Sequence, residues 1–445
     1  MAIEKRTFDF FLKDFLSKLP RVYEMDGTAY ALVLGAGASR SAGVPLAGEM
    51  VKLLKLIAKL ADIELKARPG AESELSWFFR TVLEEVPWDS EFADPEREFI
   101  AGCIARAGRE PNLTHLLVAH LAVAQIIGPI ITTNFDDLAL ASYWYSPNLT
   151  SWVEPHVVYD PFSFAGRPIK AAARVPVIIK AHGHHTMYGL GIIDEEIKKL
   201  APQVKDLFKS LPAPAEGFLV AGYSGNCDDG IVALLRDRHL TKGKMIYWFY
   251  IGGAHPDNAL VRAIARHTTI RFVQIVDSDV LFLKLVGALH SDEEYYDPPL
   301  LDPLHLVSVP PGWRWQNFRE SFAAREWWAE THSIPGTPQE AREYAPLVKL
   351  RNELLPLLTR IEKWDDDCLL FDCAPISLKR KIEDQGYPAS WEWKEPDEMK
   401  QLRKAVPLPI PWGRRNRKIL QLALTRHLDP MMPFALLMGL RQWSR

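Results

Sequence analysis

The stretch YALVLGAGAS, residues 30–39, decides the fold, because it carries an apolar strand straight into a glycine-rich turn. Five apolar residues, 30–34, are followed by Gly35. Glycine recurs at Gly37 before the chain reaches Gly43-Val44-Pro45. A turn of this kind leads the chain from a buried strand into a helix and aims free N–H groups at an anion, usually a pyrophosphate. A lone Gly-x-Gly is a weak signal, since Arg40 stands where the third glycine of the dinucleotide fingerprint belongs.

Outward from this stretch, short apolar runs alternate with longer segments of helical period as far as about residue 290, which is typical of parallel strands with crossover helices. Residues 7–19 place apolar side chains on one face, which favours a helix docked on the core. The apolar periodicity across about 46–128 is too long for one crossover and predicts an inserted helical layer. We therefore predict an α/β fold with a Rossmann-like parallel sheet whose strands span residues 30–34, 129–132, 177–180, 217–221, 244–250 and 270–276.

The composition of the sequence changes after Leu289, where the apolar runs typical of strands end and Pro and Trp residues cluster. We predict a catalytic domain at 1–290 and a mainly helical C-terminal appendage at 291–445, with helices at 337–364 and 415–428. Trp-rich surfaces are common at protein contacts, so this region is expected to serve partner or oligomer contacts. The basic cluster at 414–418 either begins a solvated helix or touches phosphate, which leaves direct nucleic-acid contact open.

Composition excludes several classes of protein. The chain has 445 residues, and 53 basic against 56 acidic residues give a net charge of −3, which argues against a disordered tail or a nucleic-acid coat. No stretch reaches the roughly 18 apolar residues of a membrane span, and the charged amino terminus does not read as an export signal. The four cysteines lack C-x-x-C spacing, which predicts a reducing cytoplasm and no structural zinc.

Three further motifs follow predicted strands, at the edge where an open α/β sheet gathers its ligand. They are TTNFD at 132–136, KAHG at 180–183 and GYSG at 222–225. Together with residues 35–45, and in this order, they resemble the sirtuin-like (silent information regulator) family over roughly residues 1–290. The resemblance implies a Rossmann-type domain that binds NAD.

The resemblance also implies roles for individual residues. His182 would be the general base beside the nicotinamide ribose, while Asn134 and Asp136 would face that ribose and the carboxamide. The rest of the nucleotide would lie against Gly35, Ala36, Gly37, Ser39, Thr133, Gly222, Ser224 and Asn226.

Chemistry favours the same residue types, because cleaving the nicotinamide glycosidic bond builds positive charge on the ribose. Other interpretations remain open: Asn134 and Asp136 are also common helix caps, and His182 is also typical of a hydrogen-bonded core histidine. His182, His184 and His185 lack nearby further ligands, so no metal is expected. Asn112 and His115 are explained by a helix cap and a buried polar contact.

Two departures from protein-deacylating sirtuins place the deacylase reaction in doubt. The zinc module with two C-x-x-C pairs is absent, and the chain reads Leu46-Ala47-Gly48 where those enzymes have Asp-Phe-Arg. The remaining likeness is to sirtuin-like NAD hydrolases of bacterial antiphage defence, which implies depletion of NAD in abortive infection, homo-oligomers and a HerA-type ATPase or other defence partner. The alternatives are a non-catalytic NAD or ADP-ribose sensor and, third, an NAD-dependent deacylase or ADP-ribosyl transferase.

Overall fold

The computed structural model describes most of the chain up to residue 291 and parts of the remainder. Its described residues fall into two compact units, the first comprising those up to 291 with 373–382 and the second those of 353–370 and 383–421. Among these residues no helix is long and apolar enough to cross a membrane. The described ranges are 3–23, 28–65, 73–86, 95–107, 111–144, 155–159, 161, 175–184, 191, 193–226, 229–253, 255–291, 353–361, 363, 365, 368–370, 373–386, 396–405, 417 and 421.

The first unit is built on one sheet of eight strands, all parallel, in the order β1-β8-β7-β6-β2-β3-β5-β4. This confirms the predicted Rossmann-like α/β class. The strands are β1 (Ile3–Arg6), β2 (Tyr30–Leu34), β3 (Ile127–Thr132), β4 (His156–Val158), β5 (Val177–Lys180), β6 (Gly217–Ala221), β7 (Met245–Ile251) and β8 (Thr269–Ile275).

The strand order reverses at β2, which lies between β3 on one side and β6 on the other. After β2 the chain adds β3, β4 and β5 on one side, with β5 between β3 and β4, and it then returns to add β6, β7 and β8 on the other side. Loops that leave neighbouring strands at such a point diverge to opposite faces and leave a crevice at their carboxyl ends. The loops after β2, β3, β5 and β6 carry the four motifs, so the topology brings them to one edge of the sheet.

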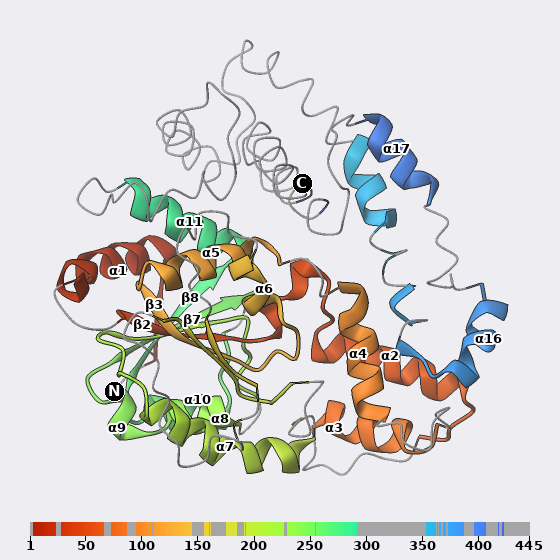
Figure 1. The fold of residues 1–445 in the computed structure, drawn as a ribbon, viewed down its shortest axis with the longest axis horizontal. Coiled ribbons are helices and arrows are strands. Elements are labelled where there is room, and N and C mark those ends of the chain that lie inside the picture. The colour runs from red at the N-terminus through yellow and green to blue at the C-terminus, as the bar shows by residue number, and fades with distance from the viewer. Residues whose placement is uncertain are drawn as a thin grey trace. The chain divides into compact units, whose positions relative to one another are not determined.

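Helices cover both faces of this sheet (Figure 1). α1, α5 and α11 pack on one face, and α7, α8 and α10 on the other, each against its own hydrophobic cluster. The helices of the first unit are α1 (Phe8–Tyr23), α2 (Ala47–Leu60), α3 (Glu74–Phe78), α4 (Pro95–Ala107), α5 (Leu113–Val123), α6 (Leu138–Trp144), α7 (Asp194–Lys209), α8 (Gly230–Leu235), α9 (Arg238–Thr241), α10 (Ala259–Ala265) and α11 (Ser278–Ser291).

The apolar spacing of α1 explains why it docks. Thr7 caps the helix by accepting the N–H of Phe10 at 3.2 Å, and Phe11, Phe15 and Leu19 then recur every four residues on the buried side. Burying one such side chain contributes about 1.5 to 3 kcal/mol. The helix predicted at 7–19 is confirmed and extends to Tyr23.

The helical layer inserted between β2 and β3 holds α2, α3 and α4, with a π-helical turn at Phe79–Leu83. Residues 373–382, which include most of helix α16 (Ile376–Asp384), belong to the same unit. Lys381 donates to the carbonyl of Leu60 at 3.0 Å, and the sulfur atoms of Cys103 and Cys373 lie 3.2 Å apart.

Three local expectations need correction. The edge strands β1 and β4 were not predicted, because β1 is mostly charged and β4 has only three residues. The predicted helix directly after the glycine turn is also wrong. Two short 3₁₀ turns, Ala36–Ala38 and Arg40–Ala42, come first, and the α-helix begins only at Ala47.

In the second unit the described residues include 353–361, which are helical, and α17 (Asp397–Ala405). Most of the predicted helices at 337–364 and 415–428 lie outside the described residues, and so does most of the predicted appendage at 291–445. The division near residue 290 therefore remains a proposal. Within the basic cluster at 414–418, Arg417 is described and forms an ion pair with Asp365.

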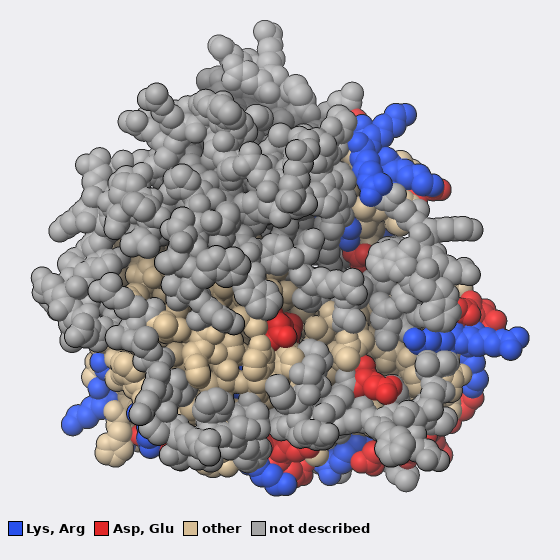
Figure 2. Space-filling model, in the orientation of Figure 1, with Lys and Arg blue, Asp and Glu red and all other residues tan. Residues whose placement is uncertain are grey.

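The described surface mixes both signs of charge. Figure 2 shows basic and acidic side chains next to each other along the lower edge of the face in view. Mixed charge of this kind agrees with the net charge of −3.

Candidate functional site

Glycines at the carboxyl ends of β2 and β6 bring two loops into direct contact. A Cβ atom on Gly35 would lie 2.4 Å from the carbonyl oxygen of Gly222, and one on Gly37 would lie 2.8 Å from the Cα of Gly222. The N–H of Gly37 donates to that same carbonyl at 2.9 Å. The glycines thus allow the two backbones to pack closely on each other. From the sequence, this loop was expected to contact the pyrophosphate of a ligand instead.

Gly222 is the most constrained of these residues, since its φ of +67° lies in the left-handed region and its Cβ would meet the nitrogen of Ala38 at 2.4 Å. We expect Gly222→Ala to lower the free energy of unfolding by about 1 to 3 kcal/mol, because both the backbone angle and the loop contact are then strained. Urea denaturation followed by circular dichroism measures this. Gly243→Ala is the matched control, with a φ of +75° but open space around its Cβ. Equal losses in the two variants would contradict the packing role.

Asn134 lies at the carboxyl end of β3 and is bound to the glycine loop. Its Nδ2 donates to Ser39 Oγ at 2.8 Å, and its side chain is 7% exposed. Its Oδ1 is buried and has no hydrogen-bond partner within the described residues. Asn134 does not cap a helix, so the capping interpretation is wrong for this residue.

Asp136, two residues further on, is 2% exposed and uses one oxygen in the way the capping interpretation expects. Its Oδ1 accepts the N–H of Leu138 at 3.1 Å, next to the start of α6. Its Oδ2 is buried and has no hydrogen-bond partner in the described part of the chain. A buried carboxylate oxygen and a buried amide oxygen without partners are costly, by about 1 to 3 kcal/mol each, unless a ligand supplies donors.

A chain of hydrogen bonds through Ser39 and His115 holds the side chain of Asn134 in place. Ser39 Oγ, which accepts from Asn134, lies 3.4 Å from His115 Nε2, and His115 Nδ1 lies 2.5 Å from Asn112 Oδ1. Asn112 Nδ2 in turn donates to the carbonyl of Ala38 at 2.6 Å. With a proton on Nδ1 of His115, every donor in this chain meets an acceptor.

Asn112 and His115 were interpreted as a cap and a buried polar contact, and both parts are confirmed: Asn112 Oδ1 accepts the N–H of His115 at 3.0 Å, and His115 is fully buried. Sequence reasoning missed their second function, which is to orient Ser39 and through it Asn134. The available signal was the polarity of His115 inside the apolar segment 113–123 and of Asn112 directly before it.

Burial lowers the pKa of His115 to about 4. The folded protein keeps this imidazole neutral between about pH 6.5 and 4, whereas the unfolded chain protonates it, so stability falls as pH falls through that interval. The loss amounts to about 1.4 kcal/mol per pH unit. We expect the wild type to lose about 2 kcal/mol more than His115→Gln between pH 6.5 and 5 in urea denaturation. Parallel losses would contradict a neutral, buried His115.

Lys180 ends β5 and lies beneath the Asn134–Asp136 loop. Its ammonium group is 1% exposed, donates to the main-chain carbonyls of Asn134, at 3.2 Å, and Asp136, and lies 3.4 Å from the carboxylate of Asp137. Burial by itself would raise the pKa of Asp137, but the hydrogen bond from His184 and the charge of Lys180 outweigh it and hold that pKa below its ordinary value. The buried cation therefore fixes the loop that carries both unpartnered oxygens.

His182 follows Lys180 and is partly exposed. Its Nε2 lies 3.1 Å from Asp229 Oδ2, and its ring centroid is 6.3 Å from that of Phe135. His184 contacts a different carboxylate, with its Nε2 2.8 Å from Asp137 Oδ2. The two histidines thus face separate partners, and within the described ranges no three His, Cys, Asp or Glu side chains form a group that could hold a metal ion.

The remaining predicted residues lie at the rim. Thr133 is half-buried and its N–H donates to the carbonyl of Leu34 at 3.2 Å. Ser224 and Asn226 are exposed, and Asn226 Oδ1 accepts from Asn258 Nδ2 at 2.9 Å. Asp229, the partner of His182, was not selected from the sequence.

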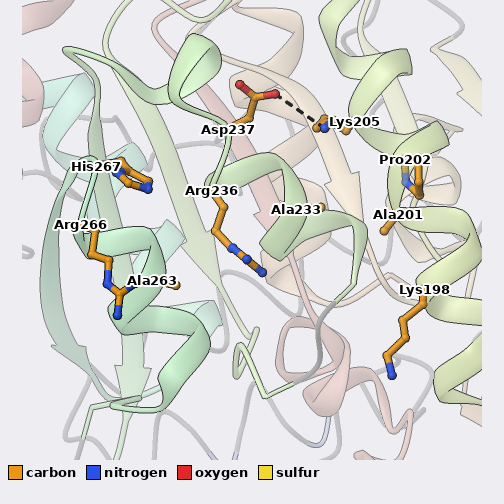
Figure 3. Close-up of a pocket in the computed structure, with 10 residues that line it drawn as sticks. All are labelled: Lys198, Ala201, Pro202, Lys205, Ala233, Arg236, Asp237, Ala263, Arg266 and His267. Atoms are coloured by element: carbon orange, nitrogen blue, oxygen red, sulfur yellow. Dashed lines mark ion pairs between the residues drawn. The ribbon is translucent and has the colours of Figure 1, made fainter.

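A separate basic groove of about 540 Å³ opens between α7, α8 and α10. Figure 3 shows Lys198, Arg236 and Arg266 around it, with Asp237 paired to Lys205 at 3.9 Å. Arg236 and Arg266 follow the carboxyl ends of α8 and α10, where a cation is favoured by the helix dipole. The groove thus lies towards the opposite end of α8 from Asp229.

Comparison with known proteins gives distant matches. No family model and no curated protein matches the chain. One matching solved structure is a Sir2 homologue in complex with NAD, with 15% identity and a TM-score of 0.33, covering 66% of this chain and 98% of that one. Another, described as a structural basis for the mechanism and regulation of Sir2 enzymes, has 16% identity and a TM-score of 0.30, covering 60% and 95%. At these values the likeness carries no information on function.

Proposed function

We propose that this protein is an NAD glycohydrolase, which cleaves NAD and water to nicotinamide and ADP-ribose. The observation that carries the proposal is a pair of buried acceptors in the loop after β3, Asn134 Oδ1 and Asp136 Oδ2, which have no hydrogen-bond partner among the described residues. The carboxamide of nicotinamide and the hydroxyls of its ribose offer donors for such oxygens. His182, at the end of β5, supplies a titratable base at the same edge of the sheet.

The proposed roles follow from this arrangement. Asp136 Oδ2 accepts an N–H of the carboxamide, and its negative charge stabilises the positive charge that develops on the ribose as the glycosidic bond breaks. The bonding electrons leave with the pyridine nitrogen of nicotinamide. Asn134 Oδ1 accepts from the attacking water or from a ribose hydroxyl, the water oxygen bonds to the ribose carbon, and His182 takes the released proton.

The other predicted contacts complete the proposed substrate site. The loop after β2 would lie beside the phosphates, and the exposed residues after β6 would face the adenosine. The residues proposed to contact the nucleotide in this way are Gly35, Ala36, Gly37, Ser39, Thr133, Gly222, Ser224 and Asn226.

We propose further that the protein acts in the cytoplasm as a NAD-depleting effector of antiphage defence, as a homo-oligomer that assembles with a HerA-type ATPase or a related partner. The support for this setting is the motif resemblance and the Trp-rich composition after residue 290. Activity is then expected to depend on assembly.

The test is nicotinamide release by the purified protein, measured by liquid chromatography with NAD alone, with NAD and an acyl-lysine peptide, and with NAD and the protein encoded by the neighbouring gene. Release from NAD without peptide, in the first or third reaction, supports the hydrolase. Release that requires the peptide would indicate a deacylase instead. Binding of NAD without release in any of the three would indicate a sensor.

A further inference from the structure

The carboxylate of Asp229 is the most fully bonded polar group near the proposed site. It is completely buried, and its Oδ1 accepts from Tyr223 Oη at 2.7 Å, from the N–H of Ile231 at 2.9 Å and from the N–H of Val232 at 3.0 Å. The two backbone bonds make Asp229 the N-cap of α8. Its second oxygen, Oδ2, lies 3.1 Å from His182 Nε2.

Helix capping accounts for only one of the two carboxylate oxygens of Asp229. One oxygen takes all three donors from Tyr223 and α8, so the cap would be complete without Oδ2. A buried carboxylate oxygen needs a donor of its own, and in the described structure the imidazole of His182 is the group that provides one. Because the three bonds to Oδ1 fix the carboxylate in position, Oδ2 is held in one direction towards Nε2.

An ionised carboxylate only accepts hydrogen bonds, so the Nε2 of His182 must carry the proton of this contact. In a neutral imidazole a proton on Nε2 leaves the lone pair on Nδ1. The same carboxylate stabilises the imidazolium that forms when Nδ1 takes a second proton. The geometry therefore defines which of the two nitrogens can act as a base.

We propose that Asp229 is a positioning residue that holds His182 in the Nε2–H tautomer and makes Nδ1 the nitrogen that accepts the proton of the attacking water. This inference rests on the proposed function, in which His182 is the base. Control of the His182 tautomer is thereby assigned to Asp229, which lies outside the four motifs and 47 positions further along the sequence.

Asp229→Asn tests the proposal while keeping the cap. The backbone N–H groups of Ile231 and Val232 hold the amide oxygen in the place of Oδ1, which turns the amide NH₂ towards His182. Nε2 must then accept a hydrogen bond, and the proton moves to Nδ1. Asp237→Asn is the matched control, because Asp237 also caps a helix, α9, by accepting the N–H of His239, while its second oxygen pairs with Lys205 and Lys209 and not with an imidazole.

The measurement is the ¹⁵N spectrum of protein labelled at histidine, with the signal of His182 assigned by its loss in His182→Ala. We expect Nε2–H in the wild type and in Asp237→Asn, and Nδ1–H in Asp229→Asn. An Nδ1–H tautomer in the wild type, or no change in Asp229→Asn, would overturn the proposal. This readout needs no turnover, so it remains decisive even if the proposed hydrolase activity fails.

Nicotinamide release provides the second readout. In a reaction where the wild type is active, we expect Asp229→Asn to lower kcat at least about tenfold, with a smaller change in KM, because the misplaced proton removes the base. The loss should not exceed that of His182→Ala. Full activity in a variant whose tautomer has changed would also overturn the proposed role of Nδ1.

Discussion

Replacing His182 with alanine is expected to lower kcat for nicotinamide release by a factor of about 10² to 10⁴, the range that a positioned general base contributes. The variant should still fold, because the side chain is partly exposed and, within the described residues, its hydrogen bond is the one to Asp229. Liquid chromatography of reactions with NAD, at substrate concentrations above and below KM, separates the loss in kcat from any change in binding.

His184→Gln is the matched control for this variant. It lies two residues further along the same loop but contacts Asp137, so nicotinamide release should fall far less than in His182→Ala. Circular dichroism establishes that both variants are folded. If His182→Ala released nicotinamide at the wild-type rate, His182 would not be the base.

Lys180→Met is expected to have the largest effect on stability, lowering the free energy of unfolding by about 3 to 5 kcal/mol. Methionine has a similar length but no charge, so the buried carbonyls of Asn134 and Asp136 would lose their shared donor, and Asp137 would lose its buried counter-ion. Since the same loop carries the two unpartnered oxygens, nicotinamide release should fall as well. Urea denaturation and the chromatographic assay measure the two effects.

Lys244→Met separates the two effects. Lys244 also donates to a loop carbonyl, that of Ala215, but it precedes β7 at the amino end of the sheet, away from the motifs. It should lower stability without lowering kcat. A Lys180→Met variant with the stability and rate of the wild type would show that the buried ammonium group does not hold the loop.

The sheet could be predicted from the sequence because its central strands are short apolar runs buried on both faces. The strands at 30–34, 177–180 and 217–221 have the predicted bounds, and the others differ by one or two residues. Of the two edge strands that were missed, β1 has no continuous apolar run and β4 has only three residues. β1 reads Ile-Glu-Lys-Arg, with side chains that suit a half-solvated edge.

The candidate site could be predicted only in part. Parallel strands bring their carboxyl ends to one edge, so the convergence of the four motifs followed from topology. The contacts of His182 with Asp229 and of Ser39 with His115 did not, because they join positions 47 and 76 residues apart through side-chain geometry. The glycines were recognised, but their observed partner is another loop, which no local pattern reveals.

The central claim is that one NAD molecule binds across the carboxyl ends of β2, β3, β5 and β6. The most direct measurement is the electron density of NAD in crystals of the His182→Ala protein soaked with NAD. We predict that the carboxamide contacts Asp136 Oδ2 and that the nicotinamide ribose lies beside Asn134 Oδ1 and position 182. Density for NAD in the basic groove between α7, α8 and α10, with the strand ends empty, would contradict the claim.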